Sequence, residues 1–143
     1  MRIMCLDIGS KRIGIALSDP LGITAQGLMT LQCTGPERDV EKIVELAREN
    51  QVNEIVVGMP YNMDGSEGPQ AVKVRSIKER IAEVSGIATS EWDERMSSMA
   101  AERALLEADL SRAKRRKVID KVAAVLILQG YLDRRSRGGP THA

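Results

Sequence analysis

The fold is decided at the start of the chain, where residues 1–19 read MRIMCLDIGSKRIGIALSD. Two short apolar runs, at residues 3–8 and 13–17, flank a polar turn at residues 9–12 that contains a glycine. Apolar runs of this length, rich in isoleucine and bounded by glycine and polar residues, are typical of a β-hairpin and not of a helix. The chain is therefore predicted to begin with two antiparallel strands.

Asp7 lies inside the first of these strands, among apolar residues. A buried carboxylate costs several kcal/mol unless it is paired or bound to a cation. One interpretation is that Asp7 caps the nearby turn. The other is that Asp7 is a metal ligand on a rigid strand, with Gly9 allowing another backbone or a phosphate to approach closely. We favour the metal ligand because the rest of the chain supplies further carboxylates.

The composition is that of a globular protein, with 43% hydrophobic and 29% charged residues in a chain of 143. This length predicts one domain over residues 1–135 and a flexible tail over residues 136–143. Since no apolar run approaches the ~18 residues of a membrane helix and no signal peptide is evident, we expect a cytoplasmic protein without a membrane partner. Two cysteines are too few for a disulfide scaffold or a thiolate zinc site, and both are predicted to be buried.

The remaining periodicity predicts an α/β fold. Strands are expected at residues 24–31, 55–57 and 87–92, and helices at residues 37–50, 70–84, from 97 or 98 onward, and 118–134. This order predicts a mixed five-stranded sheet flanked by helices, in which an antiparallel three-strand meander is joined to two parallel strands by right-handed crossovers.

A long loop, GMPYNMDGSEGP at residues 58–69, follows the interior strand. Sites in α/β sheets form at the carboxyl ends of strands, and loops of about twelve residues are unusual. The alternative is a flexible connection. We expect the loop to border the active site through Gly58, Pro60, Asn62, Asp64 and Gly65.

Three acidic positions complement Asp7. Asp93 and Glu94 end the last strand, and Asp120 lies near the start of the last helix, where a favourable interaction with the helix dipole is an alternative explanation. Carboxylates suit Mg²⁺ or Mn²⁺, and two such ions roughly 3.5–4 Å apart can support phosphodiester hydrolysis. Because neighbours in an extended strand point to opposite faces, only one of Asp93 and Glu94 should face the metals.

The net charge of +1 does not by itself indicate a nucleic-acid binder, and the distribution of the charged residues is more informative. The residues expected to hold phosphates are Lys11, Arg12, Arg95, Arg112, Lys114, Arg115, Arg116 and Lys117. The alternative for the run at residues 112–117 is a solvated surface. The scarcity of aromatic residues (Trp92, Tyr61 and Tyr131) argues against a single-strand binder built on stacking platforms.

Four segments combine into one specific pattern. They are Asp7-Ile8-Gly9-Ser10-Lys11-Arg12-Ile13-Gly14 with Ala16, Ser18 and Asp19; Gly58-Met59-Pro60 with Asn62, Asp64 and Gly65; Asp93-Glu94-Arg95 with Ser97 and Ser98; and Asp120 with Ala123 and Ala124. Together they resemble the YqgF/RuvX family of the ribonuclease H-like (RuvC-like) superfamily. The visible departure is the pair of serines where the family often has threonines.

The resemblance implies a metal-dependent nuclease that matures the 5′ end of pre-16S ribosomal RNA, or alternatively a Holliday junction resolvase. It assigns the superfamily carboxylates to Asp7, to Asp93 or Glu94 (with a preference for Glu94) and to Asp120, holding two Mg²⁺ or Mn²⁺ ions. The expected partner is structured RNA or branched DNA, bound by a monomer or a homodimer.

Two other classes of protein are considered. The D-x-G hairpin also resembles the phosphate loop of actin-like and sugar-kinase ATPases, but those need two such domains, and nucleotide binding would identify them. A non-catalytic nucleic-acid-binding module is the other, and the retained carboxylates argue against it. Stabilisation by metal would separate enzyme from module.

Overall fold

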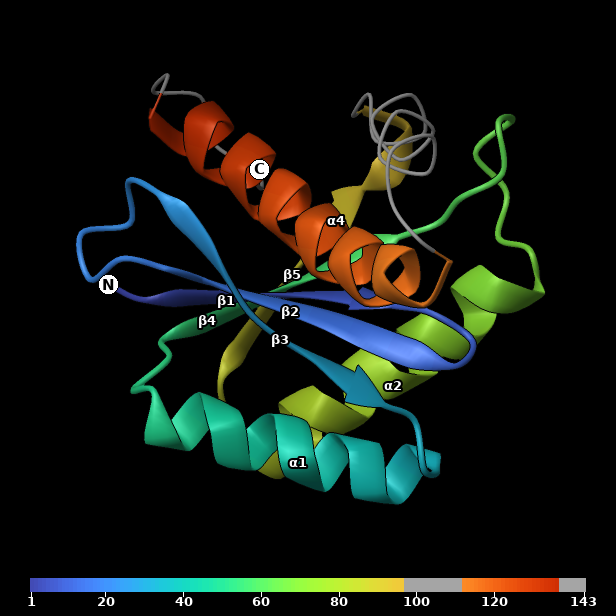
Figure 1. The fold of residues 1–143 in the computed structure, drawn as a ribbon, viewed down its shortest axis with the longest axis horizontal. Helices are drawn as coiled ribbons and strands as arrows, with labels where there is room; N and C mark the ends of the chain where they lie inside the picture. Colours follow the sequence, from blue (N-terminus) through green and yellow to red (C-terminus); the bar gives the residue numbers. More distant parts are fainter. Residues whose placement is uncertain (97–111, 137–143) are drawn as a thin grey trace.

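The core of the molecule is one five-stranded sheet with the strand order β3-β2-β1-β4-β5 (Figure 1). The structure, a computed structural model, describes the backbone of residues 1–96 and 112–136 and the side chains of residues 1–96 and 121–136. The antiparallel meander consists of β1 (Ile3–Ile8), β2 (Arg12–Ser18) and β3 (Ala25–Gln32). The strands β4 (Glu54–Met59) and β5 (Ala88–Asp93) run parallel to β1, so the predicted mixed sheet is confirmed.

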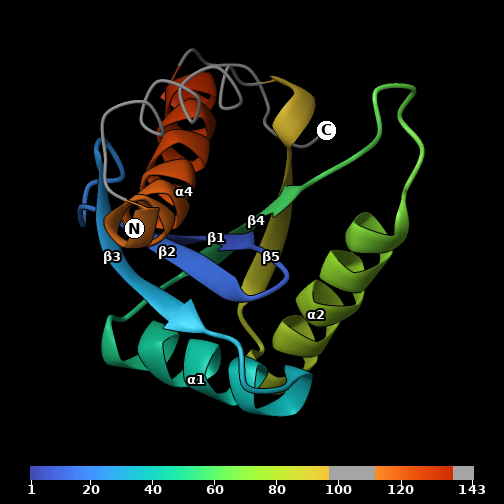
Figure 2. The same ribbon diagram turned by 45° about the vertical axis from the view of Figure 1, so that its right-hand side comes forward.

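Helices cover both faces of this sheet. On one face lie α1 (Pro36–Glu49) and α2 (Pro69–Ser85), and on the other lies α4 (Arg112–Ser136) (Figure 2). Both α1 and α2 begin with proline, whose missing N–H costs nothing at the first helical position. A single 3₁₀ turn, η1 (Glu94–Met96), follows β5 directly.

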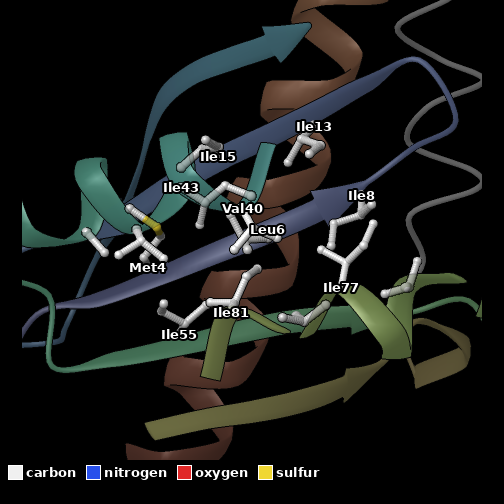
Figure 3. Packing of buried hydrophobic residues seen from close by; sticks show 14 of the residues in the cluster. Met4, Leu6, Ile8, Ile13, Ile15, Val40, Ile43, Ile55, Ile77 and Ile81 are labelled. Carbon is white, nitrogen blue, oxygen red and sulfur yellow. The ribbon is translucent and has the colours of Figure 1, made fainter. Parts of the chain in front are cut away.

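The alternation of side chains along β1 divides the core into two clusters. Met4, Leu6 and Ile8 pack against α1 and α2 in a large aliphatic cluster (Figure 3). Ile3 and Cys5 point the other way and pack against α4. Asp7 follows the same alternation, so the sheet presents it to the α4 face.

Small residues let α4 lie close to the sheet. A Cβ at Gly58 would lie 2.8 Å from Cδ1 of Ile127, and a Cβ at Gly27 would lie 2.6 Å from Cγ of Lys121. Ala123 and Ala124 are fully buried on the helix side of this contact. The α4 face is therefore built for close approach, and the α1/α2 face for bulky aliphatic packing.

Several expectations about the last helix need correction. It begins at Arg112 and not at residue 118, so the basic run at residues 112–117 forms its first turns and does not precede it. A helix built from residues 112–117 is compatible with their high intrinsic helix propensity, since arginine, lysine and alanine are good helix formers. The helix expected from residue 97 or 98 lies outside the described residues, as do residues 137–143 of the expected tail, while Ser136 still belongs to α4.

Two further expectations concern cysteine and the membrane. Cys5 and Cys33 are both free thiols, but only Cys5 is fully buried, whereas Cys33 is half-buried at the end of β3. No helix in the part of the chain that the structure describes combines the length and the apolar character needed to cross a bilayer.

Candidate active site

Gly58 has both Asp7 and Glu94 as neighbours. Leu6 pairs with Val57 in the parallel ladder, so Asp7 lies beside Gly58 on the neighbouring strand. A Cβ at Gly58 would lie 3.4 Å from Cγ of Glu94 on the α4 face. Gly58 has no side chain, so the Glu94 side chain can lie against it. The glycine thus leaves room for the Glu94 side chain, from the start of η1, next to the strand position that neighbours Asp7.

The pKa of the Cys5 thiol is affected by both carboxylates. Burial raises the pKa of this thiol well above its ordinary value, and the negative charges of Asp7 and Glu94 raise it further. Asp7 is itself buried, with 8% of its surface exposed. Negative charge from two acidic residues around one buried sulfur is an environment that a cation would stabilise.

Asp93 belongs to a different environment. It has the strand parity of Glu91, which faces α2, and it forms an ion pair of 2.6 Å with Arg95. The hydrogen bonds from Arg95 lower the pKa of Asp93 below its ordinary value. Glu94 thus lies against Gly58, which neighbours Asp7 in the ladder, whereas Asp93 is held by Arg95. Asp93 and Glu94 point in different directions for two reasons: side chains alternate along a strand, and β5 ends at Asp93 so that Glu94 already belongs to η1.

Arg95, expected to hold phosphate, is occupied by Asp93 in this structure. Its guanidinium also lies 5.7 Å from the centre of the Tyr61 ring and donates to the carbonyl of Met63 at 3.3 Å. Arg95 consequently connects η1 to the loop between β4 and α2.

Asp120 occupies the ninth position of α4, and its side chain is outside the described set. Because α4 begins at Arg112, the expectation that Asp120 lies near the start of this helix is wrong. The alternative of an interaction with the helix dipole does not apply either, since that effect is confined to the first turn. The direction of α4 is informative, because Tyr131 contacts Glu54 at the start of β4 and Ile127 contacts Gly58 near its end. The turns that precede Ile127 therefore run toward the carboxyl ends of β1 and β4.

No three acidic, histidine or cysteine side chains among residues 1–96 and 121–136 are grouped closely enough to hold a metal ion. If Asp7 and Glu94 hold a metal ion, a third carboxylate ligand would have to come from outside these residues. The convergence of Asp120 with them stays a prediction.

The turn between β1 and β2 carries the first two predicted phosphate ligands. Lys11 is exposed at its tip, and Arg12 is half-buried at the start of β2. Gly9 is required by the turn itself, because a Cβ there would lie 2.8 Å from the carbonyl oxygen of Arg12, to which the Gly9 N–H donates. The backbone that approaches Gly9 is thus the hairpin's own. The side chains of Arg112, Lys114, Arg115, Arg116 and Lys117 lie outside the described set.

The loop at residues 60–68 is ordered by its own hydrogen bonds. The N–H of Gly65 donates to the carbonyl of Asn62 at 2.8 Å, and the N–H of Ser66 donates to the carboxylate of Asp64 at 2.9 Å. Gly65 adopts a φ of 88°, which favours glycine. Figure 2 shows the loop projecting beyond the end of β4 before the chain turns back into α2.

Sequence reasoning missed an ion-pair network that anchors this loop. Glu91 accepts hydrogen bonds from Tyr61 at 2.7 Å, from Arg75 at 2.7 Å and from Lys78 at 3.2 Å. Burial would raise the pKa of Glu91, but these donors outweigh it and lower the pKa. The helical spacing of Arg75 and Lys78 was a usable signal for one polar side of α2, but nothing in the sequence pairs that side with Glu91.

Comparison with known proteins agrees with this architecture. The family model described as "RuvX: Holliday junction resolvase" matches residues 1–134. A Clostridium kluyveri protein named "Putative pre-16S rRNA nuclease" is 54% identical over 137 residues, covering 96% of this chain and 100% of the relative. A Symbiobacterium thermophilum protein of the same name is 56% identical over 140 residues, covering 98% and 97%.

Solved structures show the same fold at low identity. Thermus thermophilus RuvC in complex with a Holliday junction has a TM-score of 0.66 at 10% identity, covering 96% of this chain and 97% of that one. The fowlpox virus Holliday junction resolvase has a TM-score of 0.58 at 16% identity, covering 93% and 99%. A match to the family model over nearly the whole chain, together with relatives above 50% identity, is decisive, and the chain belongs to the RuvX family.

Proposed function

We propose that this protein is a divalent-metal-dependent nuclease that hydrolyses phosphodiester bonds, with the 5′ end of pre-16S ribosomal RNA as its substrate. The observation that supports the proposal is the position of Gly58, which neighbours Asp7 across the β1–β4 ladder and leaves room for the Glu94 side chain, whose Cγ would lie 3.4 Å from a Cβ at residue 58. The names of the relatives supply the substrate class.

The donor set fits Mg²⁺ or Mn²⁺. Carboxylate oxygens are the ligands that these ions prefer, and a cation offsets the repulsion between two close carboxylates. Asp7 and Glu94 would hold the ions together with Asp120. When bound, two such ions activate a water molecule and stabilise the leaving oxygen of a phosphodiester.

The residues around this site would bind and orient the substrate backbone. Lys11 and Arg12 lie at the carboxyl end of β1, and α4 starts at the same end with the run at residues 112–117. Cations at this position would attract phosphates irrespective of base sequence. Two cations on the β1–β2 turn and a run on α4 would thus hold a backbone over the carboxylates.

A Holliday junction resolvase is the second candidate, because the family description names that activity. Symmetric cleavage of a four-way junction requires two active sites and therefore a dimer. A side-by-side assay separates the two functions: the purified protein and Mn²⁺ are incubated with a 16S precursor RNA and with a synthetic four-way junction. Cleavage of the precursor alone supports the proposal, and symmetric cleavage of the junction alone overturns its substrate.

A further inference from the structure

The strand β3 forms one edge of the sheet. Within the part of the chain that the structure describes, β3 pairs with β2 on one side and is the last strand of the sheet on the other. Figure 2 shows it along an outer margin of the sheet. An open strand edge offers peptide N–H and C=O groups to any other strand, so proteins protect such edges with charges, prolines, bulges or covering segments.

The two edges of the sheet differ in charge. At the other edge, β5 is six residues long and contains Glu91 and Asp93, both of which form ion pairs. The eight residues of β3 read AQGLMTLQ, and none of them is charged. The uncharged run extends from Pro20 to Pro36 in a chain of which 29% is charged. Charge therefore does not protect β3 from pairing with another strand.

The first half of β3 is protected by other means. The side-chain amide of Gln129 on α4 donates to the carbonyl of Ile23 at 3.3 Å and accepts from the N–H of Ala25 at 3.1 Å. This amide thus occupies the peptide groups that a neighbouring strand would use there. A β-bulge follows, in which Leu28 is the extra residue. The second half of the strand, residues 29–32, lies beyond both features.

The backbone of this second half directs hydrogen-bonding groups outward. The N–H of Cys33 donates to the carbonyl of Lys11 at 2.9 Å, so the peptide groups of Cys33 face the β1–β2 hairpin. Successive residues of an antiparallel strand direct these groups to alternate sides. The peptide groups of Thr30 and Gln32 therefore point away from β2, toward the edge.

Apolar side chains accompany these groups on the α1/α2 face. Leu31 is half-buried against the large aliphatic cluster. Met29 pairs with Ile15, a member of that cluster, but is itself 37% exposed. A strand that covered Met29 would extend the aliphatic cluster across the edge. The surface suits an uncharged strand with apolar residues on one face, and β3 itself is such a strand.

We propose that β3 pairs with β3 of a second copy of this chain, antiparallel and about a two-fold axis, so that the two sheets become continuous. With the axis at Leu31, Thr30 of each copy is opposite Gln32 of the other, and their outward peptide groups can exchange hydrogen bonds. The same register places Met29 opposite Cys33. Because the strand is uncharged, no like charges of the two strands oppose each other.

This pairing fixes the relation between the two candidate active sites. A two-fold axis between antiparallel edge strands is perpendicular to the sheet, so α4 of both copies would lie on the same face. With strands roughly 4.8 Å apart, the two copies of β1 would be about 24 Å apart across the joined sheet. The two sites would then be open to one and the same nucleic acid. The dimer itself does not depend on the proposed nuclease function.

Analytical ultracentrifugation of the full protein at high micromolar concentration tests the proposal. We expect a dimer for the wild type and an affinity weaker by about tenfold or more for Met29→Lys, which places cations in the interface. The control is Met63→Lys, which adds the same charge at a loop position that is 89% exposed and should dimerise as the wild type does. A monomeric wild type would overturn the proposal and leave the edge to a strand of another protein.

A proline at residue 32 tests the backbone hydrogen bonds. The N–H of Gln32 points away from β2, so Gln32→Pro removes a donor to the partner and none within the sheet. This variant should weaken the dimer, whereas Gln32→Ala, which keeps the N–H, should not. Circular dichroism checks that both variants fold, and Met29→Lys decides alone if Gln32→Pro does not. Dimers of wild-type affinity in every folded variant would exclude β3 as the interface.

Disulfide formation tests the register. Opposed residues of an antiparallel pair that exchange no hydrogen bonds have Cα atoms about 4.5 Å apart, which is within the range of a disulfide. In a Cys33→Ser background, Leu31→Cys should form an intermolecular disulfide on oxidation. Gln26→Cys, on the same face of the same strand, should not. Failure of Leu31→Cys to form the disulfide would overturn this register.

Cleavage of a 16S precursor RNA in Mn²⁺ is scored separately. A dimer that does not cleave would overturn the proposed function and support the interface. A monomeric wild type that cleaves would do the reverse.

Discussion

Two buried carboxylates on the α4 face, at opposite ends of the sheet, have different surroundings. Glu54, at the start of β4, accepts hydrogen bonds from Ser90 at 2.8 Å, from the hydroxyl of Tyr131 and from Arg135 at 2.9 Å. Asp7, at the other end, lies beside Gly58, against which the Glu94 side chain is placed. Glu54 is 9% exposed and Asp7 is 8% exposed, so burial does not distinguish them.

The difference separates a structural carboxylate from a candidate functional one. At Glu54, the carboxylate accepts hydrogen bonds from both β5 and α4 and thereby links the helix to the sheet. At Asp7, we expect the carboxylate of Glu94 to raise the electrostatic free energy of the folded protein and a divalent cation to lower it. The same face of the sheet thus holds an anchor at one end and a proposed metal site at the other.

The largest effect is expected for Asp7→Asn. This change keeps the shape and removes one ligand charge, so cleavage of the precursor RNA should fall by more than about a hundredfold. That is a larger loss than the roughly 10–100-fold caused by changing a residue that only hydrogen-bonds to a metal ligand. Without metal the variant should be at least as stable as the wild type, because one of two close negative charges is gone. Urea unfolding in EDTA and cleavage in Mn²⁺ measure the two effects. Full cleavage by Asp7→Asn would eliminate the two-metal mechanism.

The matched change at the other end is Glu54→Gln, and its effect should be on stability instead. Loss of charge-assisted hydrogen bonds should lower the free energy of unfolding by about 1.5–3 kcal/mol. Cleavage at a temperature where the variant is folded should stay within a few-fold of the wild type. If Glu54→Gln abolished cleavage without destabilising the protein, the contrast between the two ends would be wrong.

The strands could be predicted because their patterns are local. The isoleucine-rich runs around the first turn and the apolar run at residues 55–57 are sufficient to place β1, β2 and β4. The buried position of Asp7 follows from the same pattern. What the sequence could not provide is the set of long-range partners. Nothing local pairs Glu54 with Arg135, 81 positions away, or brings Glu94 over Gly58.

Two other limits of the sequence have physical causes. The choice between Asp93 and Glu94 depends on a strand that ends between them and on Arg95, which forms an ion pair with Asp93. The start of α4 was placed too late because a run of basic residues resembles a loop by charge, although its helix propensity is high.

The stabilisation that Mn²⁺ provides should depend on Asp7 and not on Glu54. A ligand that binds only the folded state adds about 2.7 kcal/mol at a hundred times its dissociation constant, so Mn²⁺ should raise the melting temperature of the wild type. Glu54→Gln should show the same increment from its lower baseline, and Asp7→Asn should show little or none. An equal increment in all three proteins would place the metal elsewhere.

The basic start of α4 should act on binding with a smaller effect. Replacing Arg115 and Arg116 by alanine should weaken binding to all nucleic-acid sequences and reduce the salt slope by about 1 per residue. The control is Arg38→Ala with Lys42→Ala, two exposed cations on α1 behind the opposite face. Anisotropy titrations of catalytically inactive protein at several salt concentrations measure the slope. An unchanged slope would make residues 112–117 a solvated surface.

The smallest effect is expected for Asp93→Asn, which tests whether Asp93 is structural like Glu54. The pKa of Asp93 in the folded protein is below its ordinary value of 3.8 because Arg95 donates to it. Its contribution to stability is therefore present above pH 3.8 and is lost as the pH falls through the lowered pKa. Because the ion pair is partly exposed, the variant should lose about 0.5–1 kcal/mol at neutral pH.

Urea midpoints measured from neutral to acidic pH test this directly, since the difference between wild type and Asp93→Asn should shrink as the carboxyl group of the wild type is protonated. The variant should also keep most of its cleavage, whereas Glu94→Gln should lose it as Asp7→Asn does. The opposite result, with cleavage lost in Asp93→Asn and kept in Glu94→Gln, would transfer the ligand role to Asp93. It would require the Arg95 ion pair to open when metal binds, and the pH dependence of stability would then differ between protein with and without Mn²⁺.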